Sequence, residues 1–246
     1  MVLKERTAVV TGAAGNAALA VVRALLEDGA QVALVDPDAL RLDSLIRFLR
    51  GTTVAIPCDS SDGGAVLQAH GQIEKVLGPV DIVVNTADST STSTLETTDA
   101  DEWRRVISAN VDSAFHWSRA VVPGMKKREW GRIVNVLSHA AKNSRGDTGP
   151  AYAASHGALA SFTFALAREV AAHGITVNGV APAYVESSAA LEQLNEAQRR
   201  QLLAQIPVGR FCKPEELAHA VRFLVSPLAG FVTGEIIDLN GGILMD

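Results

Sequence analysis

The sequence predicts an α/β fold built on a doubly wound parallel sheet of about seven strands, with helices on both faces. Short runs rich in valine, isoleucine and alanine, each bounded by turn residues, recur at residues 7–12, 31–36, 53–59, 80–85, 131–138, 175–182 and 235–242. The runs are continuously apolar rather than alternating, which is typical of parallel strands that are covered on both faces. The segments between the runs have the pattern of helices, and strands that alternate with helices imply right-handed crossovers.

The composition favours one folded domain over residues 1–246. Hydrophobic residues make up 48% of the chain and charged residues 20%, so the chain can bury a large core. The net charge of −5, with scattered lysines and arginines, argues against a nucleic-acid partner. Cys58 and Cys212 lack the spacing of a disulfide framework or a metal site, which fits a cytoplasmic protein. No apolar run approaches about 18 residues and no cleavable leader precedes the first strand, so we expect a soluble protein without a membrane partner.

The first strand ends in TGAAGNAALA, residues 11–20, and a predicted helix follows directly. Small side chains at this turn let a phosphate approach the backbone N–H groups of the helix N-terminus, where the helix dipole favours an anion. The candidate cofactor-binding residues of the turn are Gly12, Gly15, Asn16 and Ala17. Glycine and alanine are also common in ordinary tight turns, so the turn alone leaves both interpretations open.

The second strand ends in Asp36, and this residue favours a nucleotide at the same edge of the sheet. A carboxylate here can accept both ribose hydroxyls of an adenosine and would repel a 2′-phosphate. No lysine or arginine stands at residues 35–40 to offset that repulsion, so the sequence favours NAD over NADP. Alternatively, Asp36 is a turn residue before Pro37. Asp59, at the end of the third strand, either reaches the adenine edge or caps the helix that begins near Asp62.

Two polar connections interrupt the pattern of strands and helices. Residues 86–103 form a predicted loop, in which Thr98 and Asp101 resemble a capping box that opens the next helix. Residues 183–213 hold a polar helical stretch that ends before Pro214. We interpret this second segment as a substrate lid over a pocket or as an ordinary surface excursion.

These features resemble the short-chain dehydrogenase/reductase family over the whole chain, which implies a single Rossmann-like domain that binds a dinucleotide. The family's TGxxxGxG turn is matched by Thr11, Gly12, Asn16 and Ala18. Its NNAG turn after the fourth strand is matched by Asn85, Thr86, Ala87 and Asp88. Its PGxxxT segment after the sixth strand is matched by Pro182, Ala183, Val185 and Ser187. The resemblance implies further cofactor contacts at Asn85, Ala87, Pro182, Val185 and Ser187.

The resemblance also implies a catalytic group of asparagine, serine, tyrosine and lysine. The matching positions are Asn110, Ser138, Tyr152 and His156, so YxxxH stands where the family has YxxxK. Tyr152 would act as the acid/base and also contact the cofactor, and Ser138 would hold the substrate oxygen. Asn110 would hold a water or a backbone bend for proton relay, and His156 would be an altered cofactor contact.

Elementary chemistry supports the same role for the tyrosine. Hydride transfer between a carbon and a nicotinamide needs a proton moved at the adjacent oxygen, and a tyrosine can move it when its pKa falls from about 10 toward the working pH. Tyr152 and His156 lie four positions apart on one predicted helix face, so a cation at position 156 would lower the pKa of Tyr152. Histidine is shorter than lysine and less often charged at neutral pH. His139, Lys142 or Arg145 could supply the missing charge instead.

The sequence thus favours an NAD-dependent oxidoreductase that interconverts an alcohol and a carbonyl of a small molecule by hydride transfer. One alternative is a non-redox enzyme similar to lyases or dehalogenases, because relatives of that kind keep the serine and the tyrosine and change the lysine. The other alternative is a catalytically impaired NAD-binding protein or an inactive subunit. The resemblance further implies a homo-oligomer, a tetramer or a dimer, with contacts through the predicted helices around residues 100–127 and 150–173.

Overall fold

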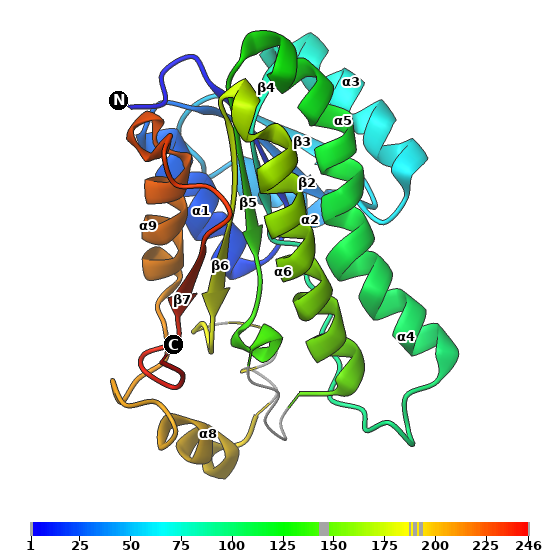
Figure 1. Cartoon of the computed structure of the whole chain (residues 1–246), viewed down its shortest axis with the longest axis vertical. Coiled ribbons are helices and arrows are strands. Elements are labelled where there is room, and N and C mark those ends of the chain that lie inside the picture. Colours follow the sequence, from blue (N-terminus) through cyan, green and yellow to red (C-terminus); the bar gives the residue numbers. More distant parts are fainter. Residues whose placement is uncertain (1, 143–147, 187, 189–190, 192–193, 246) are drawn as a thin grey trace.

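The computed structural model describes residues 2–142, 148–186, 188, 191 and 194–245. Its strands form one seven-stranded sheet in the order β3-β2-β1-β4-β5-β6-β7, and each neighbouring pair is parallel (Figure 1). The strands are β1 (Thr7–Thr11), β2 (Gln31–Asp36), β3 (Thr53–Pro57), β4 (Val80–Asn85), β5 (Gly131–Val136), β6 (Ile175–Pro182) and β7 (Ile236–Leu239). Each strand lies within a predicted run, and the predicted Rossmann-like fold class is confirmed.

The helices form two layers, one on each face of the sheet (Figure 1). One face is covered by α1 (Asn16–Glu27), α2 (Ala39–Ile46) and α9 (Pro214–Val225). The other is covered by α3 (Gly63–Leu77), α5 (Ser113–Arg128) and α6 (Pro150–Val170). Adjacent β1 residues show why the runs are continuously apolar: Val10 packs in the first layer and Val9 in the second, and both are fully buried.

The helix α4 (Ala100–Ile107) begins one residue later than the sequence predicted. Its N-cap is Asp99, whose carboxylate accepts the N–H groups of Asp101 and Glu102 at 2.9 and 2.7 Å. The hydroxyl of Thr98 instead donates to the carbonyl of Thr94 at 2.7 Å. The predicted capping box was therefore wrong, because a carboxylate is available one position further on and satisfies two of the free N–H groups of the helix.

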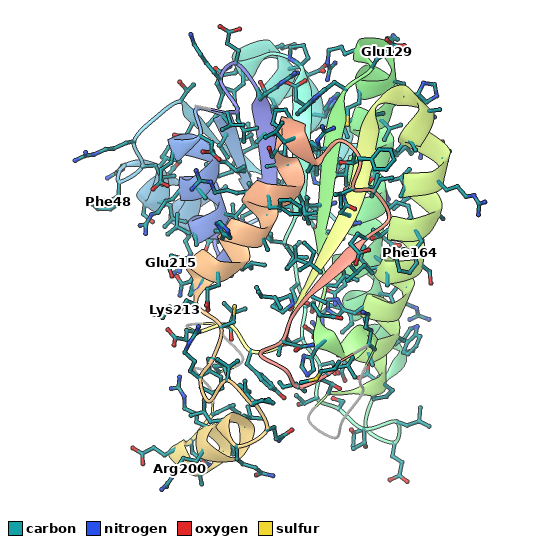
Figure 2. All side chains as sticks on the ribbon, turned by 60° about the vertical axis from the view of Figure 1, so that its left-hand side comes forward. Phe48, Glu129, Phe164, Arg200, Lys213 and Glu215 are labelled. Carbon is teal, nitrogen blue, oxygen red and sulfur yellow. The ribbon has the colours of Figure 1, made fainter. Side chains whose placement is uncertain are left out.

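The carboxyl ends of the strands open toward one end of the molecule. The strand order reverses between β1 and β4, so the connections that leave these two strands diverge there and make a crevice. The segment after β6 carries α8 (Glu196–Leu203) beyond this edge, and Figure 2 shows Arg200 of α8 and Glu129 at opposite ends of the molecule. None of the helices in the described ranges is both long and apolar enough to span a membrane.

Candidate active site

A cavity of about 470 Å³ occupies the crevice at the carboxyl ends of the strands. Its lining joins the turn after β1, the end of β2, the loop after β4, the segment after β5, the start of α6 and the segment after β6. Among the predicted site residues, those that line it are Gly12, Gly15, Asn16, Ala17, Asp36, Ser138, Tyr152, Pro182 and Val185. Predicted cofactor-binding residues (the nucleotide end, with Gly12 and Asp36) and the predicted catalytic residues Ser138 and Tyr152 (the chemical end) therefore share one cavity.

The turn after β1 is tied closely to the loop after β4. Gly12 has φ of +59°, and a Cβ atom at this position would lie 2.8 Å from the Cα of Ala87. The hydroxyl of Thr11 accepts the N–H groups of Thr86 and Ala87 at 3.1 and 3.3 Å. Position 12 therefore requires a glycine for two reasons, its left-handed backbone and the close approach of the second loop.

Replacing Gly12 by alanine is expected to lower the free energy of unfolding by about 2–5 kcal/mol. A left-handed conformation costs an ordinary residue about 1–2 kcal/mol, and forcing extra volume into a packed contact costs about 1–3 kcal/mol. Urea unfolding measures the change. Gly71→Ala is the control, because a Cβ there meets no atom within 4 Å and position 71 lies inside α3. An equal loss in both variants would contradict this account of Gly12.

Two hydrogen bonds hold the carboxylate of Asp36 beside the turn after β1. Its Oδ2 accepts the N–H of Ala14 at 3.1 Å and its Oδ1 accepts the N–H of Asp38 at 3.0 Å. Arg41 also reaches this turn, because its Nε donates to the carbonyl of Ala14 at 2.7 Å. The sequence interpretation missed Arg41, which stands one position beyond the stretch 35–40 that holds no lysine or arginine.

Several predicted cofactor contacts lie outside the cavity lining. Asn85 is buried and its Nδ2 donates to Asn135 of β5 at 2.8 Å, so its amide ties two strands together. Ala87 holds the turn through its backbone, as described above. Asp59 accepts from the N–H and the hydroxyl of Ser61 at 2.9 and 2.6 Å. It does not cap α3, whose N-cap is Asp62. Ser187 lies outside the described residues.

The predicted catalytic residues Ser138 and Tyr152 line the cavity together, and their side chains are hydrogen-bonded. Ser138 follows β5, is 5% exposed, and its hydroxyl accepts the N–H of Ala140 at 3.2 Å. Tyr152 stands in the first turn of α6, which begins at Pro150. The rings of Tyr152 and His156 meet edge to face with centroids 4.4 Å apart. The prediction that these two residues share a helix face is therefore confirmed.

The structure corrects the expected electrostatics of Tyr152. Its hydroxyl donates to Oδ2 of Asp88 at 3.2 Å. Burial and then the charge of Asp88 raise the pKa of Tyr152 well above its usual value near 10, and a hydrogen bond with Ser138 offsets only part of this. The expectation of a lowered pKa considered the cation at position 156 and not an acid in the loop after β4. Asp88 is thus a site residue that the sequence interpretation left without a role.

His156 pairs with the same acid. Its side chain is 3% exposed, and its Nε2 lies 3.4 Å from Oδ1 of Asp88. Neither ring nitrogen has a hydrogen-bond partner among the described residues. One carboxylate therefore contacts both the tyrosine and the residue that replaces the family's lysine.

Asn110 holds the loop that carries Asp88. It lies in the π-helix Ser108–Asp112, where α4 passes into α5, and it is 2% exposed. Its Oδ1 accepts the N–H of Ser89 at 2.7 Å, and its Nδ2 donates to the carbonyl of Ser89 at 3.2 Å and to the hydroxyl of Ser155 at 3.0 Å. The amide is therefore bonded to the chain next to Asp88, and its part in a proton relay stays a prediction.

The other candidate cations are placed differently. Lys142 forms an ion pair with Asp238, with 2.7 Å between Nζ and Oδ2. His139 is buried beside the cavity, and its ring packs against Tyr184 with centroids 5.2 Å apart. Arg145 lies outside the described residues. The charged group that accepts a hydrogen bond from Tyr152 among the described residues is Asp88.

Comparison with known proteins decides the family. A family model described as enoyl-(acyl carrier protein) reductase matches residues 12–244. The 3-oxoacyl-[acyl-carrier-protein] reductase FabG of Vibrio cholerae is 38% identical over 249 residues and covers 100% of both chains. The chain belongs to the short-chain dehydrogenase/reductase family. The FabG of Pseudomonas aeruginosa is 39% identical with the same coverage.

Solved structures support the assignment of the chain to the short-chain dehydrogenase/reductase family. A 3-oxoacyl-[acyl-carrier protein] reductase from Brucella melitensis superposes with a TM-score of 0.93 at 31% identity, covering 100% of this chain and 93% of the other. A second structure from the same organism, with bound NAD, gives a TM-score of 0.90 at 31% identity and the same coverage. The chain is an NAD(P)-dependent oxidoreductase that acts on a carbonyl, and the non-redox and inactive alternatives are not favoured.

Proposed function

We propose that this enzyme uses NAD(H) in preference to NADP(H) to interconvert a secondary alcohol and its carbonyl. The observation that carries the proposal is the single cavity that runs from Gly12 and Asp36 to Ser138 and Tyr152. When bound, the nicotinamide accepts or supplies the hydride. Ser138 holds the substrate oxygen, and Tyr152 moves the proton at that oxygen.

The residues at the nucleotide end fit a dinucleotide. The glycine at position 12 leaves no Cβ between the turn and the loop after β4, and α1 begins directly after this turn at Asn16. Backbone N–H groups at such a helix N-terminus bind phosphate. The carboxylate of Asp36 suits the two ribose hydroxyls and opposes a 2′-phosphate. The guanidinium of Arg41 beside Ala14 would instead favour a 2′-phosphate.

The names of the relatives indicate which substrates to test first. They are reductases of 3-oxoacyl groups carried on acyl carrier protein, so we propose 3-oxoacyl thioesters as the substrate class. We also propose that residues 183–213 act as a substrate lid, because Tyr184, Val185, Ser188 and Leu191 line the cavity. The test is NADH-dependent reduction of a 3-oxoacyl thioester and a ketone panel. Wild-type protein that binds NAD and reduces none of them would contradict the proposed reaction.

Asp36→Asn is expected to reduce the preference for NAD over NADP by about tenfold or more. The change keeps an oxygen acceptor for the N–H of Ala14 and removes the charge that repels a 2′-phosphate, and like charges brought together cost several kcal/mol. Calorimetric titration of both dinucleotides measures the effect. Asp43→Asn removes one exposed charge from α2 and serves as the matched control. A preference that is unchanged in Asp36→Asn would remove this basis for NAD.

We further propose that the enzyme works in the cytoplasm as a homo-oligomer, a tetramer or a dimer. Aromatic side chains are exposed on the helices that the sequence named as contacts: Trp103 of α4, Phe115 of α5 and Phe164 of α6. Figure 2 shows Phe164 on the outer side of α6. Apolar side chains gathered on a surface are typical of an interface between protein chains.

A further inference from the structure

We propose that Asp88 is a catalytic residue of this enzyme and serves as the proton acceptor behind Tyr152, with His156 as its positioning residue. The inference rests on the proposed function, because it assigns the proton path of the same reaction. It concerns two residues in contact with each other, both of which differ from the family's pattern. Asp88 stands where the family's NNAG turn has glycine, and His156 stands where the family has lysine.

Tyr152 and Asp88 are in direct hydrogen-bond contact. The Tyr152 hydroxyl donates to Oδ2 of Asp88 at 3.2 Å, so the phenolic proton already points to the carboxylate. Asp88 lines the same cavity as Ser138 and Tyr152. Its side chain is 38% exposed, which gives a proton taken from Tyr152 a route to water.

The carboxylate is held from two sides. Asn110 bonds both the N–H and the carbonyl of Ser89, the next residue in the chain. His156 lies on the far side, with Nε2 3.4 Å from Oδ1 of Asp88 as an ion-pair contact, and its buried ring nitrogens have no hydrogen-bond partner in the described part of the chain. A buried imidazole is stable when its N–H reaches an acceptor, and Asp88 is the acceptor at hand.

The proton path balances without an ionised tyrosine. In alcohol oxidation, a bound nicotinamide would take the hydride from the substrate carbon, whose C–O bond becomes C=O. The hydroxyl proton of the substrate passes to Oη of Tyr152 while the phenolic proton passes to Oδ2 of Asp88, which then releases it to water. One hydride and one proton leave the alcohol, and carbonyl reduction is the reverse. The raised pKa of Tyr152 suits this path, because the tyrosine stays neutral before and after the transfer.

Two variants of Asp88 test the proton role by turnover. Asp88→Asn keeps an oxygen for the Tyr152 hydroxyl but cannot take a proton, so kcat should fall by about 10²-fold or more with little change in KM. Asp88→Gly should lose a similar amount, and added formate should restore its turnover in proportion to the formate concentration. Asp101→Asn, which removes a carboxylate bonded to Arg104 on α4, should keep wild-type kcat.

A second readout does not depend on turnover. The chain has two tyrosines, Tyr152 and Tyr184, so Tyr184→Phe leaves a single tyrosine whose ionisation is followed by ultraviolet absorbance. Adding Asp88→Asn to this background should lower the pKa of Tyr152, because the carboxylate charge that disfavours the phenolate is gone.

The outcomes separate the two proposals. Wild-type kcat in Asp88→Asn, an unchanged titration of Tyr152, or a loss of turnover in Asp88→Gly that formate does not restore would each overturn the assignment of Asp88. Wild-type protein that turns over no alcohol or carbonyl would instead overturn the proposed function and the proton role with it. In that case the titration still reports whether the carboxylate acts on Tyr152.

Discussion

Replacing Tyr152 by phenylalanine is expected to lower turnover by about 10²- to 10⁴-fold and to leave the affinity for the nicotinamide cofactor largely unchanged. The variant removes the phenolic oxygen that lines the cavity and donates to Asp88, which interrupts the proposed proton path between the substrate oxygen and Asp88. General acid–base catalysis contributes an effect of this size. Steady-state kinetics with saturating NADH, together with calorimetric titration of the cofactor, measure the two quantities.

Two controls test whether the loss of turnover comes from the missing Tyr152 hydroxyl. Tyr184→Phe removes the other phenolic oxygen at the cavity, on a ring packed between His139 and Phe211, and should affect KM rather than kcat. Urea unfolding of Tyr152→Phe should change by no more than about 1 kcal/mol, because Asp88 is partly exposed and water can replace the lost donor. Wild-type kcat in Tyr152→Phe would show that another group moves the proton.

The strands and the outline of the site were accessible from the sequence for a physical reason. Buried parallel strands must be apolar on both faces, so their runs are visible without knowledge of the fold. The four-residue spacing of Tyr152 and His156 fixes their common face in any α-helix, and the contact of their rings follows from it. Gly12 and Asp36 were found because Gly12 directly follows β1 and Asp36 ends β2, and the carboxyl ends of parallel strands meet at one edge of the sheet.

The role of Asp88 could not be found in this way, because it depends on the path of an irregular loop. Residues 86–99 show neither the helical nor the strand periodicity of apolar residues. The direction of the side chain at position 88 is therefore set by tertiary contacts alone. The structure shows that Asn110, from a different helix, fixes that path through Ser89. The expected sign of the pKa shift of Tyr152 was wrong because burial of the tyrosine raises its pKa most and the charge of Asp88, from this loop, raises it further.

Asn85 and Asp59 show a related limit. Asn85 ends β4 and Asp59 lies two residues after β3, as expected of residues at the crevice, yet Asn85 bonds to Asn135 of the neighbouring strand and Asp59 bonds to Ser61 within its own turn. A polar residue at a strand end can face either the cavity or a neighbouring strand, and the sequence does not distinguish the two. Arg41 is the converse case, since a helix residue reaches the nucleotide turn from the next element.

The double variant Asp88→Gly/His156→Lys is expected to recover most of the turnover that Asp88→Gly alone loses. His156→Lys by itself should gain little, because the introduced ammonium meets the carboxylate of Asp88, which lies 3.4 Å from the present Nε2. With the carboxylate removed, the lysine acts on Tyr152 as an unopposed cation and lowers its pKa. The tyrosine can then move the proton without an acid behind it, as the family's lysine arrangement implies.

The four proteins of this cycle distinguish a working pair from two unrelated losses. Starting from a loss of about 10²-fold in Asp88→Gly, we expect the double variant to lie within about tenfold of wild type, a coupling of about 1.4 kcal/mol or more and within the range for residues in contact. Tyrosine titration in the Tyr184→Phe background should give the lowest pKa for the double variant. Additive effects on kcat would mean that Asp88 and His156 do not act on Tyr152 together. Coupling would mean that the acid and the histidine form one unit, which exchanges the proton of Tyr152 by a route different from that of a lysine.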